Sequence, residues 1–143
     1  MKIKAVNHIC VVVRDKQAAE NFYVGVLGLN RHHKIESWFV VTKETTLHLV
    51  EIPEAEATES LYHEIQHFAL QVEDLPAAYD TLLDADLKPF QMDFQGTEKA
   101  LSARNDPLSF GLGSVFVRDP DGNLVEFLEE GRGIFTADMR PQV

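Results

Sequence analysis

The chain has 143 residues, of which 45% are hydrophobic and 25% charged, and its formal net charge is −10. This length suits one domain, or two half-size units that share a core. The acidic charge argues against nucleic acid as a partner, and no apolar run approaches the ~18 residues of a membrane span. We therefore expect no nucleic-acid or membrane partner and a cytoplasmic location.

The first third of the chain predicts one strand, one helix and three further strands. Asp15 is a predicted N-cap, and Gly28 is predicted to end the helix that follows. The expected elements are a strand at 5–13, a helix at 16–27 and strands at 30–35, 38–42 and 45–52. They make a first module at about 4–53, and the Glu- and Ala-rich stretch 54–64 is expected to be a linker.

The rest of the chain repeats this order of elements. Asp74 is a second predicted N-cap, with a proline in the first turn of its helix. The expected elements are a strand at 66–72, a helix at 76–85 and strands at 87–94, 113–118 and 123–128. They make a second module at about 65–130, followed by a tail at 131–143, and we treat the whole of 1–143 as a single domain.

The two modules are an internal repeat. Adding 59 to His8 and Asp15 gives His67 and Asp74, and adding 78 to His48 gives Glu126. Neither half can bury a sheet face alone, so we predict an α+β fold in which two pseudo-symmetric βαβββ modules form a curved eight-stranded sheet with helices outside. The second copy is 19 residues longer, and the excess falls at 95–112, which has the length and glycines of a mobile lid.

Symmetric positions on strands point into equivalent space, so His8, His67, His48 and Glu126 are expected to converge on the concave face. Imidazole and carboxylate groups bind borderline transition metals. We predict His8, His67 and Glu126 as ligands of one divalent ion, which could be Zn, Ni, Fe, Mn or Co. His48 is either a fourth ligand or a nearby catalytic acid or base.

The other candidate residues have simpler interpretations. Cys10 lies in an apolar strand and is expected to be buried. His32, His33 and His63 fall outside the symmetric set and are expected at the surface. Trp38 and Phe116 are aromatic residues at equivalent positions. Two interpretations are equally favoured for them: packing in the core, or forming a hydrophobic wall of a substrate pocket.

These motifs resemble a known family. The stretches "NHICVVVRD", "FYVGVLGL", "LHLVE", "QHFALQVED" and "DPDGNLVEF" are similar to those of the vicinal oxygen chelate superfamily. That superfamily includes glyoxalase I, bleomycin-resistance proteins, fosfomycin-resistance thiol transferases and extradiol dioxygenases. The resemblance implies paired modules, a metal held at His8, His67 and Glu126, a homodimer, and a pocket that includes Ser114 and Phe116.

The resemblance also orders the possible functions. His48 replaces the glutamate of bacterial glyoxalase I, which weakens the case for that reaction. We expect a metal-dependent enzyme acting on a small molecule chelated through neighbouring oxygens, with lyase or isomerase chemistry first. A ring-cleaving dioxygenase or an antibiotic-modifying thiol transferase comes next, and a metal-free, drug-sequestering protein of bleomycin-resistance type is the alternative from another class.

Overall fold

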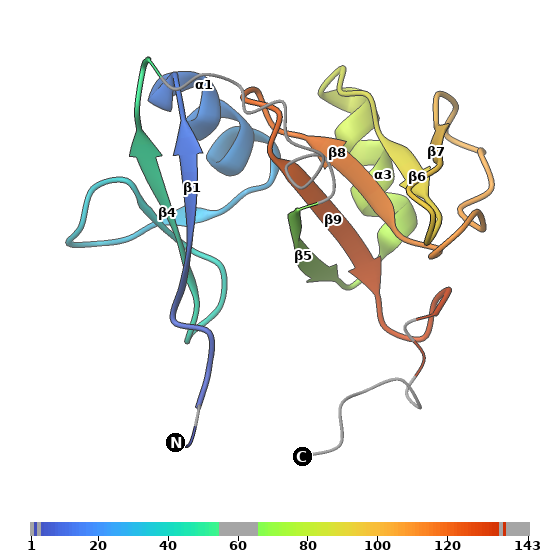
Figure 1. Ribbon diagram of the computed structural model, residues 1–143, viewed down its shortest axis with the longest axis horizontal. Coiled ribbons are helices and arrows are strands. Elements are labelled where there is room, and N and C mark those ends of the chain that lie inside the picture. The colour runs from blue at the N-terminus through green and yellow to red at the C-terminus, as the bar shows by residue number, and fades with distance from the viewer. Residues whose placement is uncertain (1, 3, 55–65, 135, 137–143) are drawn as a thin grey trace. The chain divides into compact units, whose positions relative to one another are not determined.

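The computed structural model describes residues 2, 4–54, 66–134 and 136, and it divides into two compact units. Unit 1 comprises Met1–Thr58 with Pro120–Gly122, and unit 2 comprises Glu59–Asp119 with Asn123–Val143. The expected linker at 54–64 and tail at 131–143 lie mostly outside the described residues. Each unit contains one module of the repeat (Figure 1).

Unit 1 is a four-stranded sheet with helical residues packed on one face. Its strands are β1 (His8–Val13), β2 (Asn30–Arg31), β3 (Trp38–Val40) and β4 (Thr46–Glu51), in the order β1-β4-β3-β2. The helical stretch is α1 (Lys16–Glu20) continued by a π-helix, η1 (Asn21–Val26). The helix expected at 16–27 is therefore present, but its second half has wider turns than predicted.

The wider turns have a packing consequence. Phe22 and Tyr23, which are neighbours in sequence, are both buried, and their rings meet edge to face with centroids 4.9 Å apart. Gly28 ends the helical stretch with a φ of 73°, as the sequence predicts. A π-helical turn has more residues than an α-helical one, so adjacent side chains are separated by a smaller angle around the axis, and both of these are buried.

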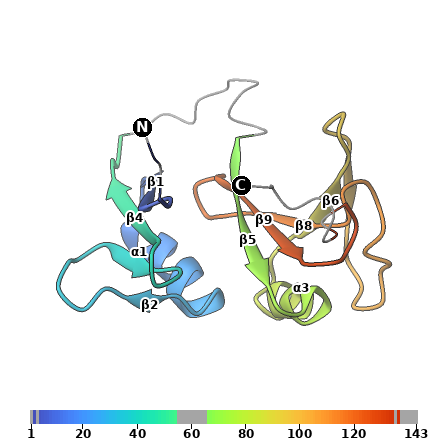
Figure 2. The same ribbon diagram turned by 90° about the horizontal axis from the view of Figure 1, so that it is seen from below.

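Unit 2 has the same plan with one strand more. Its strands are β5 (His67–Val72), β6 (Phe90–Met92), β7 (Glu98–Ala100), β8 (Val115–Arg118) and β9 (Leu124–Glu129), in the order β5-β9-β8-β6-β7. Its helix is α3 (Leu75–Asp84), which packs on one face of the sheet (Figure 2). The two βαβββ modules are confirmed, and the strand that the sequence did not predict is β7.

The repeat extends to the register of the strands. In both units the first strand pairs in parallel with the last, β1 with β4 and β5 with β9. His8 lies opposite Thr46 and His67 lies opposite Leu124, which are equivalent pairs under the two sequence offsets. Because side chains alternate along each strand, this shared register places equivalent residues on equivalent faces.

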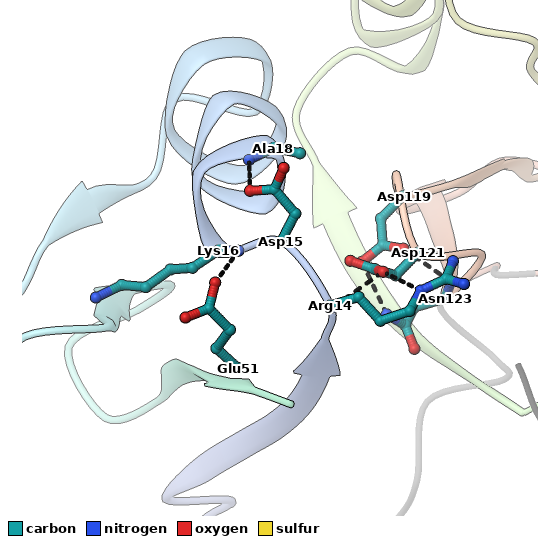
Figure 3. Close-up of polar contacts among 8 residues, drawn as sticks. All are labelled: Arg14, Asp15, Lys16, Ala18, Glu51, Asp119, Asp121 and Asn123. Atoms are coloured by element: carbon teal, nitrogen blue, oxygen red, sulfur yellow. Dashed lines mark hydrogen bonds and ion pairs between the residues drawn. The ribbon is translucent and has the colours of Figure 1, made fainter. Parts of the chain in front are cut away.

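The repeat also provides a second anchor for each helix, beyond its cap. Asp15 and Asp74 accept hydrogen bonds from the third helical residue, as expected of N-caps. In addition, Glu51 Oε1 accepts from the backbone N–H of Lys16 at 2.9 Å (Figure 3), and Glu129 Oε2 accepts from that of Leu75 at 2.7 Å. The last strand of each module therefore holds the N-terminus of its own helix.

The longer segment of unit 2 is fixed at several points. Asp106 Oδ2 accepts from the N–H groups of Ser102 and Ala103, at 2.7 and 2.9 Å. The buried Gln91 accepts from the N–H of Phe110 at 3.1 Å. Gly111 has a φ of 56°, and a Cβ there would lie 2.2 Å from the carbonyl oxygen of Met92. These contacts hold the segment in the conformation that the structure describes, and a mobile lid at 95–112 stays a prediction.

We predict that Glu129→Ala lowers the free energy of unfolding by about 1–2 kcal/mol, because the part-buried N–H of Leu75 loses its acceptor. Glu51→Ala should lower the free energy of unfolding by less, since the hydrogen bond from Lys16 to Glu51 is exposed and water can replace it. Urea denaturation measures both, with Glu44→Ala as an exposed control. Equal values for all three variants would show that these carboxylates do not anchor the helices.

Asp106 gives a prediction about pH. The N–H groups of Ser102 and Ala103 lower the pKa of the Asp106 carboxyl below its ordinary value. Because the carboxyl has a lower pKa in the folded state, it stabilises the fold at any pH above its pKa in the unfolded state, which is about 3.9. That stabilisation is lost as the pH falls through the lower pKa of the folded state. Wild type should therefore exceed Asp106→Asn in free energy of unfolding at pH 7 and converge with it at the acid end. A constant difference across this range would exclude the linkage.

Candidate functional site

The predicted site residues of unit 1 lie on the sheet face opposite the helix. In β1 the buried Val11 and Val13 alternate with His8 and Cys10, which are exposed. In β4 the buried Leu47 and Leu49 flank His48, whose Cα partners are Cys10 in β1 and Trp38 in β3. Strand alternation thus places the two imidazoles and the indole on one face, as predicted.

Three rings on this face form a cluster. The Trp38 and His48 rings are stacked, with centroids 4.6 Å apart and planes at 19°. The His8 ring lies 4.9 Å from Trp38 and 6.5 Å from His48, between centroids. Trp38 therefore contacts both histidines and restricts how their rings can rotate.

His8 is oriented by its neighbour. Its Nδ1 lies 3.0 Å from Oδ1 of Asn7. An amide oxygen can only accept, so Nδ1 carries the proton and the lone pair of Nε2 is available to a metal or a ligand. Asn7 was not assigned a role from the sequence, although an amide beside a candidate ligand is the kind of signal that could have identified it.

Cys10 is exposed, whereas the sequence led us to expect a buried side chain. The error comes from the run "ICVVV", which is apolar on both faces of the strand although only one face packs on the helix. An all-apolar run predicts a strand that is covered on both faces. The described residues of unit 1 do not cover the face that carries Cys10.

In unit 2 the structure brings together His67 and Glu126. Glu126 is 4% exposed, and its Oε2 lies 3.1 Å from Nε2 of His67. The two residues come from β5 and β9, whose parallel register places Ala69 opposite Glu126. The His67 ring also meets Phe116 edge to face, with centroids 5.7 Å apart.

The second oxygen of Glu126 identifies this pair as unusual. Glu126 Oε1 is buried and has no hydrogen-bond partner among the described residues. A buried carboxylate oxygen without a partner costs about 1–3 kcal/mol or more, so proteins rarely leave one unless something else binds there. Glu126 is thus a buried acceptor that one imidazole only partly satisfies.

These donors fit a divalent metal ion. Two ligand atoms about 2.1 Å from one ion, at angles of about 90–110°, stand about 3.0–3.4 Å apart. The Nε2 and Oε2 atoms, 3.1 Å apart, match that spacing. Imidazole nitrogen and carboxylate oxygen are also the donor types that borderline transition metals take.

Ser114 and Phe116, the predicted pocket residues of unit 2, are both buried. The Phe116 ring stacks with that of Phe90, with centroids 5.8 Å apart, and packs with Met92 and Leu124. The hydroxyl of Ser114 is buried and has no hydrogen-bond partner among the described residues. Phe116 therefore packs in a core cluster here, and Ser114, like Glu126, has a buried polar atom without a partner among the described residues.

A charged pair completes this face of unit 2. Arg118 follows Phe116 by two residues on β8, so it shares that strand face. Its Nη2 lies 2.9 Å from Oε1 of Glu98, and its guanidinium lies 5.6 Å from the centroid of the Phe90 ring. Neither residue was assigned to the site from the sequence. Arg118 lies at the end of a predicted strand, whereas β7, which carries Glu98, was not predicted.

The predicted ligands thus form two groups, one in each unit. His8 and His48 lie in unit 1, and His67 and Glu126 lie in unit 2. Over its described residues, neither unit gathers three or more His, Cys, Asp or Glu side chains that could hold an ion. Of the other histidines, His32 and His33 line a surface hollow of unit 1, and His63 lies outside the described residues. A three-ligand site of His8, His67 and Glu126 stays a prediction.

Sequence comparison identifies the family. The model of the family described as "Glyoxalase/Bleomycin resistance protein/Dioxygenase superfamily" matches residues 5–127, which is most of the chain. No curated protein is similar enough to the chain to count as a match. The helices of the described residues include none long and apolar enough to cross a membrane.

Solved structures share the fold at low sequence identity. A glyoxalase/dioxygenase from Nostoc punctiforme is 19% identical, with a TM-score of 0.61, over 88% of this chain and 90% of its own. Lactoylglutathione lyase from Agrobacterium tumefaciens is 21% identical, with a TM-score of 0.58, over 90% and 96%. TnmS3, an antibiotic-binding protein from Streptomyces sp. CB03234, is 20% identical, with a TM-score of 0.57, over 90% and 98%. At these identities the likeness concerns the fold alone.

The unsatisfied oxygen of Glu126 gives a prediction. In chelator-treated protein, Glu126→Leu should raise the free energy of unfolding by about 1–2 kcal/mol, because it removes a buried charge that lacks a full set of partners. The matched control is Glu129→Leu, on the same strand. It should lower the free energy of unfolding, because the Glu129 carboxylate holds the N-terminus of α3. Urea denaturation measures both, and equal losses would show that Glu126 is a structural residue.

Proposed function

The chain belongs to the glyoxalase/bleomycin resistance protein/dioxygenase superfamily, and from this we propose that it is a metal-dependent enzyme acting on a small molecule bound through neighbouring oxygen atoms. The superfamily contains both enzymes and non-enzymatic binding proteins that take small molecules. The proposal assigns this chain to the first group.

One observation carries the proposal. Glu126 is buried, offers one oxygen 3.1 Å from the His67 imidazole, and leaves the other oxygen without a partner among the described residues. A residue that only stabilises the fold would be expected to have both oxygens satisfied, as buried polar groups usually are. A buried carboxylate with one unsatisfied oxygen beside an imidazole suits a pair of metal ligands.

We assign the ion to His8, His67 and Glu126, and we give His48 the role of a fourth ligand or an acid–base group. Asn7 supports this assignment. Its amide oxygen accepts the proton of Nδ1 of His8, which leaves the lone pair of Nε2 available to a metal ion. The ion, when bound, would act as a Lewis acid that polarises the substrate oxygens. It could be Zn, Ni, Fe, Mn or Co, since imidazole and carboxylate donors suit each of these.

His48 is the residue best suited to move a proton. Imidazole changes charge near neutral pH, so it can both take and return a proton under physiological conditions. Its stacking on Trp38 holds the ring plane, which fixes the direction in which its nitrogens can reach a substrate. In this assignment Trp38 forms a wall of the substrate pocket, to which we also assign Ser114 and Phe116.

The type of reaction is proposed in order of preference. Lyase or isomerase chemistry comes first because it needs only a held substrate and a proton carrier, which this chain offers in His48. Ring-cleaving dioxygenation and thiol transfer to an antibiotic follow. We also expect a homodimer, the common assembly of this superfamily, and analytical ultracentrifugation would exclude it if the chain sediments as a monomer at micromolar concentration.

The proposal predicts about one transition-metal ion per chain in protein purified without chelators or a metal-affinity tag, as measured by elemental analysis. His67→Ala should reduce that content to background, because it removes one of three protein ligands, and should leave the circular dichroism spectrum unchanged. The matched control is His33→Ala, which removes an imidazole outside the ligand set and should retain the metal.

Unchanged metal content in His67→Ala would contradict the ligand assignment. A consistently empty wild-type protein that also takes up none of the five candidate metals would contradict the enzyme itself. That second result would favour the metal-free, drug-sequestering alternative.

A further inference from the structure

A cavity of about 490 Å³ lies in unit 1, beside α1 and the connection between β2 and β3. It is lined by Lys16 and Glu20 of the helix and by the segment 31–39. Small-molecule sites typically occupy about 300–1,000 Å³, so the hollow could hold a ligand of modest size. None of the four residues assigned to the metal or to proton transfer lines it.

The charge of the cavity lining differs in sign from that of the chain. Lys16, Arg31 and Lys34 line it together with two acidic residues, Glu20 and Glu36, whereas the whole chain carries a net charge of −10. A hollow lined by an excess of one sign concentrates its field and attracts ions of the other sign. On an acidic protein, a cationic hollow is therefore a candidate site for anions.

Two of the cations are held in place by Glu20. Its Oε2 lies 2.7 Å from Nη2 of Arg31, and its Oε1 lies 4.0 Å from Nζ of Lys16. The hydrogen bond from Arg31 lowers the pKa of the Glu20 carboxyl, which keeps that carboxyl ionised. This bond uses one N–H of Arg31, whose side chain is 57% exposed, so a guanidinium fixed at the cavity keeps donors for a ligand.

The histidines of the cavity add a neutral donor and a flat surface. Nδ1 of His32 accepts from the backbone N–H groups of Lys34 and Ile35, both at 3.2 Å. A nitrogen that accepts carries no proton, so the proton of the neutral ring is on Nε2, which is a donor. The His33 ring stacks on it, with centroids 4.7 Å apart and planes at 26°.

Residue Trp38 borders the cavity, but its indole lies on the opposite face of the sheet, stacked on His48. Ile35, which also lines the cavity, is 48% exposed. A site for a bare inorganic ion has no use for stacked imidazoles and an aliphatic side chain, whereas such surfaces favour a ligand with a flat apolar part. The lining thus combines cationic side chains with apolar surface.

We propose that this cavity binds a small planar organic anion of the aryl phosphate class. Arg31, Lys34 and Nε2 of His32 supply the N–H donors that a phosphate group takes. The stacked imidazoles of His32 and His33 and the side chain of Ile35 supply the surface for the ring. The site does not depend on the proposed metal centre, so it can be tested in metal-free protein.

The test is isothermal titration calorimetry of chelator-treated, full-length protein at low ionic strength. Phenyl phosphate should give a saturable binding isotherm, and added salt should weaken the binding. Phenol and inorganic phosphate, which each carry half of the ligand, should bind at least about tenfold more weakly. No saturable isotherm with phenyl phosphate, or equal affinities for all three probes, would overturn the proposal.

Three variants locate the binding. Lys34→Gln should weaken phenyl phosphate binding by about threefold to tenfold, and Glu36→Gln should strengthen it by a similar factor, because each changes the charge of the lining in the opposite direction. The matched control is Lys43→Gln, which removes an exposed lysine of the same unit outside the cavity and should leave the affinity unchanged. Equal weakening in Lys34→Gln and Lys43→Gln would mean general charge attraction and would overturn the assigned site.

Discussion

The parallel pairing of the first strand with the last strand in each module is the constraint on which the rest of the structure depends. It places His8 and His48 on one sheet face in unit 1, and His67 and Glu126 on one face in unit 2. Parallel strands need a crossover, and in each module the helix supplies it on the opposite face. The helices can therefore bury one face of each sheet while the candidate ligands occupy the other.

The helix anchors follow from the same pairing. Because the last strand runs alongside the first, its terminal glutamate, Glu51 or Glu129, ends beside the point where the helix begins. One carboxylate in each module thereby satisfies an N–H group that the helix itself cannot use. The two units differ between these fixed ends, where the extra segment of unit 2 forms β7 and is held by Gln91, Asp106 and the close approach of Gly111 to Met92.

The structural carboxylates differ from the candidate ligand in whether their oxygens have hydrogen-bond partners. Glu129 contacts the N–H of Leu75, and Glu20 binds Arg31, so each has a defined partner. Glu126 is the most buried of the three and has an oxygen with no partner among the described residues. The energetic cost of that oxygen is the physical reason for assigning the residue to ligand binding.

The sequence by itself determined the repeat, the two helix caps, most of the strands and the sheet faces of the candidate ligands, because alternation and capping are local rules. It did not determine that residues 21–26 form a π-helix, that Cys10 is exposed, or that β7 exists, since these depend on which surfaces pack together. The His67–Glu126 contact, the unsatisfied oxygen and the cationic cavity of unit 1 likewise belong to tertiary structure. Distances between side chains of separate elements are set by packing, and no local pattern in the chain encodes them.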